Sequence, residues 1–184
     1  PIPMAQAVNA DSAKAKKAAK LVADFYKAAL PIIAKEKPAN GFLMRGIAHQ
    51  PEIPTFQQRY GMRAGCIAVY PMYKGVSRLV GMDVIETDGH DSAADEFNRV
   101  AKIWNDYDFV FCHIKYTDSR GEDGNFDAKV KVIEEVDAAL PILTALNPSV
   151  MIITGDHSTP AALKSHSWHP VPTLLHAPKT HMPD

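Results

Sequence analysis

The chain has 184 residues, which is enough for one domain or slightly more and for a substantial hydrophobic core. Its 20 basic and 21 acidic residues give a net charge of −1, which argues against nucleic acid or a membrane surface as a partner. Cys66 and Cys112 lie inside apolar runs, no apolar run reaches about 18 residues, and no signal peptide is recognisable, so we expect a cytoplasmic protein without disulfides.

The N-terminal part is predicted to contain one long helix. Residues 12–37 are rich in Ala, Lys and Leu, with apolar residues at helical spacing and Asp11 or Ser12 as a candidate N-cap. Pro31 is expected to kink this helix or to end its first part. The segments that follow are expected to be a strand at 41–44, a loop at 49–55 and a short helix at 55–60.

From residue 64 onward, short apolar runs alternate with helical patterns. The runs that predict strands are 65–69, 83–85, 109–114, 150–153 and 173–175. The patterns that predict helices are 71–80, 93–104 and 126–146. Strands joined by helical crossovers form parallel sheets, so the sequence predicts an α/β fold, a mostly parallel sheet flanked by helices.

Polar residues follow three of the predicted strands. Residues 71–74, 113–118 and 155–157 each come directly after an apolar run. Because functional loops collect beyond the carboxyl ends of parallel strands, we expect these acid, imidazole and amine groups to meet at one edge of the sheet.

The segment 154–172 is the most informative of these. It places Asp156, His157, His166 and His169 in one short window, and carboxylate and neutral imidazole groups are good ligands for zinc or manganese. The alternative is structural: Asp156 and His157 would cap a turn, Ser158 and Thr159 would cap a helix with Pro160 at its first position, and the other histidines would lie on the surface.

Asp118 and Glu122 form a second candidate ligand pair. Their i,i+4 spacing would place both carboxylates on one side of a helical turn, where a divalent cation could bind. The alternative is an acidic turn that complements a helix dipole, with Asp123 or Asn125 as the cap. His113 fits an ordinary core histidine as well as a site residue.

Taken together, these segments resemble the alkaline phosphatase superfamily, and within it the archaeal-type cofactor-independent phosphoglycerate mutases. The similarity is carried by Gly155-Asp-His-Ser-Thr-Pro160 followed by His166-Ser-Trp-His-Pro-Val-Pro172. Four further motifs support it: Leu43-Met-Arg-Gly46, Pro54-Thr-Phe-Gln-Gln-Arg-Tyr-Gly61, Lys74-Gly-Val-Ser-Arg-Leu-Val-Gly-Met-Asp83 and Lys129-Val-Lys-Val-Ile-Glu-Glu-Val-Asp137.

The resemblance implies two divalent metal ions. Asp156 and His157 would bind one, and Asp118 and His166 the other, together with Glu122 at a position where many relatives carry histidine. A carboxylate there makes the site harder, which favours manganese, with zinc or magnesium as alternatives.

The reaction implied is transfer of a phosphoryl group between the 3- and 2-hydroxyls of glycerate, a step of glycolysis, through a phospho-enzyme and without a bisphosphoglycerate cofactor. Lys74 would act as a catalytic residue that stabilises phosphoryl oxygens, and His169 would be a further catalytic residue near the substrate. Arg45 would bind the substrate's carboxylate or phosphate. A solvated lysine and a surface ion pair are the alternatives for Lys74 and Arg45.

Compared with that family, this chain resembles the C-terminal half. Residues 1–63 would be the C-terminal part of an inserted α/β substrate-holding domain, and 64–184 the C-terminal half of the metal-binding core. We therefore expect the chain to lack the nucleophile, to be inactive alone, to pair with an N-terminal half, and otherwise to self-associate as a homo-oligomer. A metal-dependent phosphohydrolase and a non-catalytic interaction module remain alternatives.

Overall fold

The computed structural model describes residues 5–44, 46–88 and 92–177. The chain forms two compact units, residues 1–51 and 52–184. This division falls before the boundary at residue 63 that the sequence suggested. The identity of the two predicted domains stays a prediction.

The first unit is built on one helix, α1 (Ala13–Ile33), whose N-cap Ser12 accepts a hydrogen bond from the backbone of Ala15. Pro31 lies inside α1 and does not end it, so of the two expected effects, a kink or an end, the end is wrong. A proline in the last turn removes only one backbone bond. Tyr26 is buried, stacks on Phe42 with 4.5 Å between ring centroids, and donates a hydrogen bond to the carbonyl of Phe42.

The strand expected at 41–44 is absent from the described part of this segment. Phe42 packs on α1 instead of pairing with a strand, so the apolar run 41–44 is explained by contact with a helix. Arg45, the predicted substrate-binding residue, lies outside the described residues.

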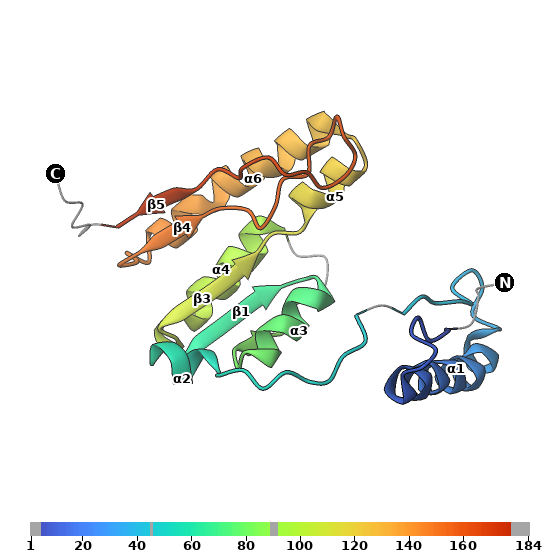
Figure 1. The fold of residues 1–184 in the computed structure, drawn as a ribbon. Helices are drawn as coiled ribbons and strands as arrows, with labels where there is room; N and C mark the ends of the chain where they lie inside the picture. Colours follow the sequence, from blue (N-terminus) through green and yellow to red (C-terminus); the bar gives the residue numbers. More distant parts are fainter. Residues whose placement is uncertain (1–4, 45, 89–91, 178–184) are drawn as a thin grey trace. The chain divides into compact units, whose positions relative to one another are not determined.

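The second unit contains a parallel sheet, as predicted, with strands in the order β2 (Asp83–Ile85), β1 (Ala64–Ala68), β3 (Phe109–His113) (Figure 1). All five residues of β1 are buried, and Cys66 and Ile67 have no exposed surface. Helices α3 (Pro71–Leu79) and α4 (Ala93–Ile103) are the crossovers, and right-handed connections place them on opposite faces of the sheet. The short helix α2 (Phe56–Tyr60) precedes β1, and a capping box formed by Thr55 and Gln58 stabilises its N-terminus.

After β3 the chain forms α5 (Tyr116–Glu122) and then α6 (Phe126–Thr144), whose N-cap is Asn125. Helix α5 was not among the predicted helices, although the spacing of Asp118 and Glu122 suggested a helical turn there. A cluster of buried and half-buried side chains joins α6 to α4, with Phe97 and Ala139 at its centre. This packing fixes α5 and α6 beside the end of β3.

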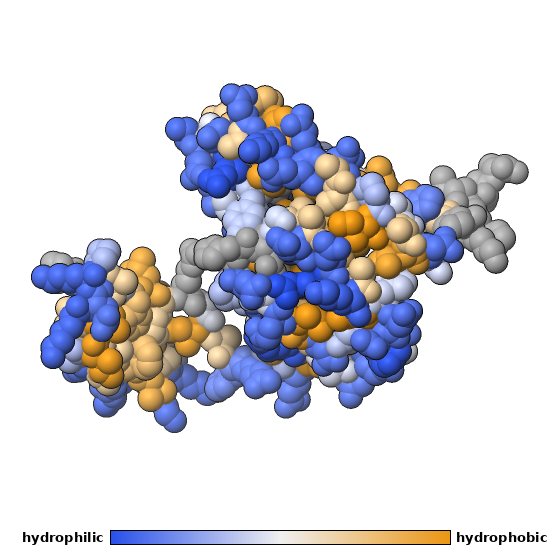
Figure 2. All heavy atoms as spheres, turned by 180° about the vertical axis from the view of Figure 1, so that it is seen from behind, coloured by the Kyte–Doolittle hydropathy of each residue, from blue (hydrophilic) through white to orange (hydrophobic). Residues whose placement is uncertain are grey.

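The last two strands, β4 (Met151–Ile153) and β5 (Leu174–His176), form a separate antiparallel pair. They were predicted as strands, but not as a pair detached from the parallel sheet. Hydrophobic side chains interrupt the hydrophilic surface of the molecule (Figure 2), and those exposed on and beside this pair are Val150, Ile152, Leu174 and Leu175.

Candidate metal centre

Two segments bring acidic and imidazole groups together. Helix α5 directly follows β3 and presents Asp118 and Glu122 one turn apart, as their spacing predicted. The segment after β4 carries His157 and His166, and Ser158 pairs with Ser167 in an isolated antiparallel bridge. This bridge sets the two imidazole rings against each other, with 3.8 Å between their centroids.

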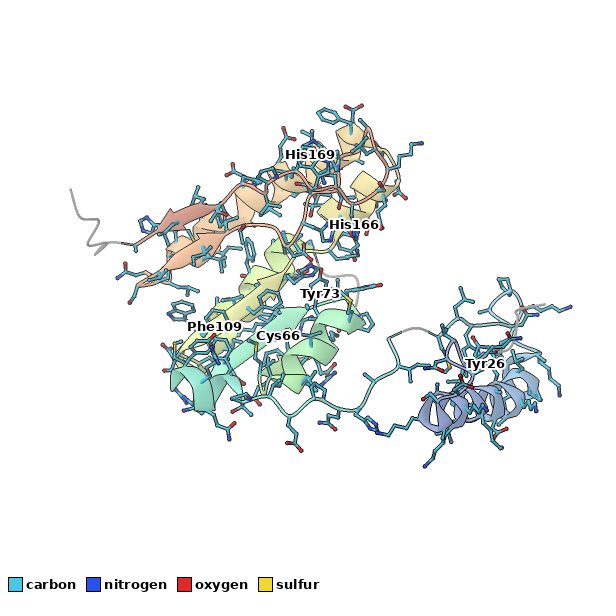
Figure 3. All side chains as sticks on the ribbon, viewed as in Figure 1. Tyr26, Cys66, Tyr73, Phe109, His166 and His169 are labelled. Atoms are coloured by element: carbon cyan, nitrogen blue, oxygen red, sulfur yellow. The ribbon has the colours of Figure 1, made fainter. Side chains whose placement is uncertain are left out.

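Asp118, His157 and His166 form the centre of the cluster. Each offers one ligand atom, and these three atoms all lie within 4.8 Å of one another. His166 Nε2 is 3.6 Å from Asp118 Oδ1 and 3.6 Å from Glu122 Oε1. His166 projects toward α5 (Figure 3).

Asp156 joins the cluster through His157. The Nε2 atom of His157 is 3.6 Å from Asp156 Oδ2 and 4.0 Å from Asp118 Oδ1. All five predicted metal ligands are therefore linked by contacts of 4.0 Å or less. These distances are long for hydrogen bonds, but two ligand atoms each about 2.1 Å from one ion lie roughly 3–4 Å apart. The donor set and its spacing thus fit a divalent cation.

Thr159 determines which nitrogen of His157 is free to bind. Its hydroxyl lies 2.6 Å from Asp118 Oδ1 and 3.0 Å from His157 Nδ1. Because a carboxylate only accepts, the hydroxyl donates its single hydrogen to Asp118 and accepts from Nδ1–H of His157. The lone pair of His157 is then on Nε2, the nitrogen that faces the two carboxylates.

The helix start expected at Ser158 and Thr159 is wrong, because the described chain forms a bridge and turns there. The hydroxyl of Ser158 donates to the carbonyl of His169, and Thr159 is buried against Asp118. Ser158 therefore ties two parts of the loop together, and Thr159 ties the loop to α5; neither side chain caps a helix.

The carboxylates are kept ionised by neighbouring donors. Burial alone would raise the pKa of Asp118, but hydrogen bonds from the Lys115 ammonium and the Thr159 hydroxyl outweigh it and lower that pKa. The same balance lowers the pKa of Asp156, where the Tyr73 hydroxyl donates a short hydrogen bond to Oδ2. Burial and the Asp156 carboxylate together raise the pKa of Tyr73, so its phenol keeps the proton that it donates.

Tyr73 and Lys115 were not singled out from the sequence. Tyr73 lies in the first turn of α3, inside the segment 71–74 that the sequence had marked as following a strand, but no role was assigned to it. Its ring stacks on His113 with 3.6 Å between centroids. His113 is half-buried, its Nδ1 has no hydrogen-bond partner among the described residues, and burial lowers its pKa.

The two predicted catalytic residues make other contacts. Lys74 Nζ donates to the Thr87 hydroxyl at 3.0 Å. His169 hydrogen-bonds to the Ser167 hydroxyl through Nδ1 and stacks on Trp168 (Figure 3). Within the described part of the chain, neither side chain forms a hydrogen bond, ion pair or ring contact with the five-residue cluster. Their catalytic roles therefore stay predictions.

Comparisons with known proteins agree with this chemistry. The chain is 53% identical over 168 residues to a probable 2,3-bisphosphoglycerate-independent phosphoglycerate mutase of Aquifex aeolicus, which covers 91% of this chain and 41% of the relative. The name of this relative, which further curated relatives share, confirms the family resemblance inferred from the motifs. The chain spans about two fifths of the length of the curated relatives that it matches.

Solved structures show the same fold. The PH0037 protein of Pyrococcus horikoshii superposes with a TM-score of 0.73 and 30% identity, over 90% of this chain and 49% of that one. The cofactor-independent phosphoglycerate mutase of Thermoplasma acidophilum superposes with a TM-score of 0.59 over 94% of this chain and 46% of that one, and its 23% identity carries the fold alone.

The described helices include none that is long and apolar enough to cross a membrane. The sequence model of a single family matches residues 3–183, almost the full length of the chain. With this match, and with acidic and imidazole side chains that could hold a metal ion gathered at the end of its sheet, the chain belongs to the metalloenzyme superfamily.

Proposed function

We propose that this chain provides the metal-binding side of the active site of a cofactor-independent phosphoglycerate mutase. The observation that carries the proposal is the cluster around Asp118, His157 and His166, in a chain 53% identical to a relative of that name. The reaction would interconvert 3-phosphoglycerate and 2-phosphoglycerate without bisphosphoglycerate.

The five residues would hold two divalent ions. Asp156 and His157 would bind one, while Asp118, Glu122 and His166 would bind the other. Three carboxylates and two imidazoles form a donor set of intermediate hardness, which favours manganese over zinc or magnesium. When bound, such ions neutralise charge on phosphoryl oxygens and activate a hydroxyl nucleophile.

The residues around the ligands would orient them. Lys115 donates to Oδ2 of Asp118 and leaves Oδ1 facing the two imidazoles. Tyr73 donates to Oδ2 of Asp156, the oxygen that faces His157, and so holds this carboxylate beside the ring. Thr159 fixes the ring of His157 with Nε2 inward. Preorganised ligands of this kind bind a metal without a large rearrangement.

The remaining substrate contacts are proposals from the family resemblance. Lys74 would stabilise phosphoryl oxygens, His169 would lie near the substrate, and Arg45 would bind its carboxylate or phosphate. The nucleophilic hydroxyl would come from polypeptide that corresponds to the part of the relatives this chain does not match. The 184-residue chain alone should therefore bind metal but turn over no 3-phosphoglycerate.

A chimera tests this proposal. The unmatched part of the Aquifex aeolicus relative is joined to this chain, and formation of 2-phosphoglycerate is followed with and without Mn²⁺. We expect metal-dependent mutase activity that Asp118→Asn lowers about 100-fold or more, since a lost ligand exceeds the effect of an outer contact. Asp123→Asn is the matched control, because this aspartate of the same region is exposed and pairs with Arg120.

Three outcomes would contradict the proposal. Release of inorganic phosphate without 2-phosphoglycerate would indicate a metal-dependent phosphohydrolase. Failure of both the chain and the chimera to bind Mn²⁺ in a calorimetric titration would favour a non-catalytic role. Full activity of the Asp118→Asn chimera would remove the assigned ligand.

A further inference from the structure

Lys129 of α6 connects the two segments that carry the candidate ligands. Its Nζ donates to the carbonyl of Thr117 in α5 and to the carbonyl of Thr159 in the loop after β4, each at 3.0 Å. The side chain is half-buried, between the helix that carries it and these two backbone segments. An ordinary surface lysine keeps its ammonium in water, so this placement needs a reason.

Both carbonyls belong to residues beside the metal cluster. Thr117 directly precedes Asp118 in α5. Thr159 follows His157 by two residues, and its own hydroxyl contacts both Asp118 and His157. A shift of either carbonyl would therefore change the distance between a ligand on α5 and a ligand on the loop.

Gly121 shows how closely the two segments approach at this point. A Cβ atom on this buried glycine would lie 2.2 Å from the carbonyl oxygen of Thr159 and 3.2 Å from Lys129 Nζ. Only a residue without a side chain allows α5 to pack this tightly on the loop. The contact between α5 and the loop thus has Gly121 on one side and the Lys129 ammonium on the other.

A cation suits this position chemically. Two carbonyl oxygens that point at one spot repel each other, and an ammonium satisfies both with two of its three hydrogens. Fixing a lysine side chain costs rotamer entropy, so the two hydrogen bonds must offset that loss. A neutral aliphatic side chain offers no hydrogen to either carbonyl.

We propose that Lys129 is a positioning residue for the metal centre: its ammonium holds the Thr117 and Thr159 carbonyls so that Asp118 and His157 keep the relative positions that the metal centre needs. The proposal rests on the proposed metal centre but adds a residue outside the ligand set. Both hydrogen bonds of Lys129 go to backbone carbonyls and not to a ligand side chain, so its effect is transmitted through backbone positions.

The test measures Mn²⁺ affinity of the 184-residue chain from the electron paramagnetic resonance signal of free Mn²⁺. Lys129→Met keeps the length of the side chain and removes the charge, and we expect affinity to fall about 10- to 100-fold. Lys131→Met is the matched control on the same helix, because Lys131 is exposed and pairs only loosely with Glu135 at 3.9 Å. Its affinity should equal that of the unmodified chain.

Chemical rescue separates the charge from the packing. Lys129→Cys is alkylated with 2-bromoethylamine, which rebuilds a lysine-like ammonium, or with bromoethane, which gives a neutral side chain of similar shape. The same treatments of the unsubstituted chain control for Cys66 and Cys112. We expect only the aminoethyl adduct to regain Mn²⁺ affinity, and this comparison stays valid if Lys129→Met does not fold.

Equal affinity of the two adducts, or of Lys129→Met and the unsubstituted chain, would overturn the positioning role and leave the metal centre intact. Absence of Mn²⁺ binding by the unsubstituted chain would instead overturn the metal centre itself. The two failures are therefore distinguishable in one titration series.

Discussion

The parallel sheet and the β4–β5 pair are each followed by one of the two segments that carry candidate metal ligands. The two sheets differ in how far their strands are buried and paired. β1 lies between β2 and β3 and is buried along its whole length. β3 runs from this sheet into α5 and Asp118. By contrast, β4 pairs only with β5 among the described strands, and all three residues of β5 are exposed.

This difference indicates where the geometry of the site comes from. Asp118 inherits its position from a packed sheet and from α6. His157 and His166 follow a lightly covered strand, so their position depends on local contacts such as the Ser158–Ser167 bridge and the bonds of Thr159 and Lys129. The position of Asp118 is therefore set by the packed core, and the positions of His157 and His166 are set by the contacts of the loop.

The largest expected effect tests the packing side of this comparison. Ile67→Ala in β1 removes a fully buried side chain and should lower the free energy of unfolding by about 2–5 kcal/mol. Ile152→Ala in β4 removes a side chain that is 60% exposed and should change it by less than about 0.5 kcal/mol. Urea unfolding followed by circular dichroism measures both.

Similar losses for the two isoleucines would contradict the contrast between the sheets. Such a result would mean that the β4–β5 pair is covered in solution, for example by a second copy of the chain. Analytical ultracentrifugation of the same samples would detect such self-association.

An intermediate effect is expected where α5 meets the loop. Gly121→Ala would force a Cβ against the Thr159 carbonyl, so we expect a loss of about 1–3 kcal/mol in unfolding free energy. Gly75→Ala is the matched control within helix α3, because its Cβ would meet nothing within 4 Å. Alanine is the better helix former there, so this variant should gain about 0.5–1 kcal/mol.

If Gly121→Ala were as stable as the unsubstituted chain, α5 and the loop would not be in tight contact. The close approach of Gly121 to the Thr159 carbonyl would then give no support to the positioning role proposed for Lys129. The same denaturation curves answer this question without any metal.

Much of this fold could be predicted from local pattern. Apolar runs predicted β1 to β5 to within one residue. Burial in the sheet explains the apolar run of β1, whereas β5 is exposed and its apolar run is not explained by burial. Helices α1, α4 and α6 were predicted from spacing and caps. The strand expected at 41–44 failed because an apolar run is satisfied equally well by a helix surface.

The candidate ligands were predicted because their type and spacing carry the signal, whereas the supporting residues were not. Lys115 contacts Asp118 only three residues away, at the start of α5, but this helix was not predicted. Tyr73 and Lys129 act through contacts with residues that are distant in the sequence. The role of Thr159 was misread for the same reason, since a threonine before proline normally suggests a helix start. Only the arrangement of α5 against the loop reveals these contacts.

The smallest expected effect on stability concerns Thr159, the side chain that joins the core-held ligand to the loop-held one. Thr159→Val keeps the shape but removes the hydroxyl that donates to Asp118 and accepts from His157. We expect a loss of about 1 kcal/mol in unfolding free energy, because Lys115 still neutralises the carboxylate. Mn²⁺ affinity should fall about 10-fold or more, since His157 loses the contact that fixes its tautomer.

Thr159→Ser is the matched control, because it loses only the methyl group and should retain Mn²⁺ affinity. Long-range ¹H–¹⁵N spectra of the metal-free chain at alkaline pH report the tautomer directly. In the unsubstituted chain and in Thr159→Ser the proton of His157 should be on Nδ1, and in Thr159→Val a share should move to Nε2. An unchanged tautomer in Thr159→Val would show that the ring is oriented by the strand and bridge alone, and the position of His157 would then be set by the fold in the same way as that of Asp118.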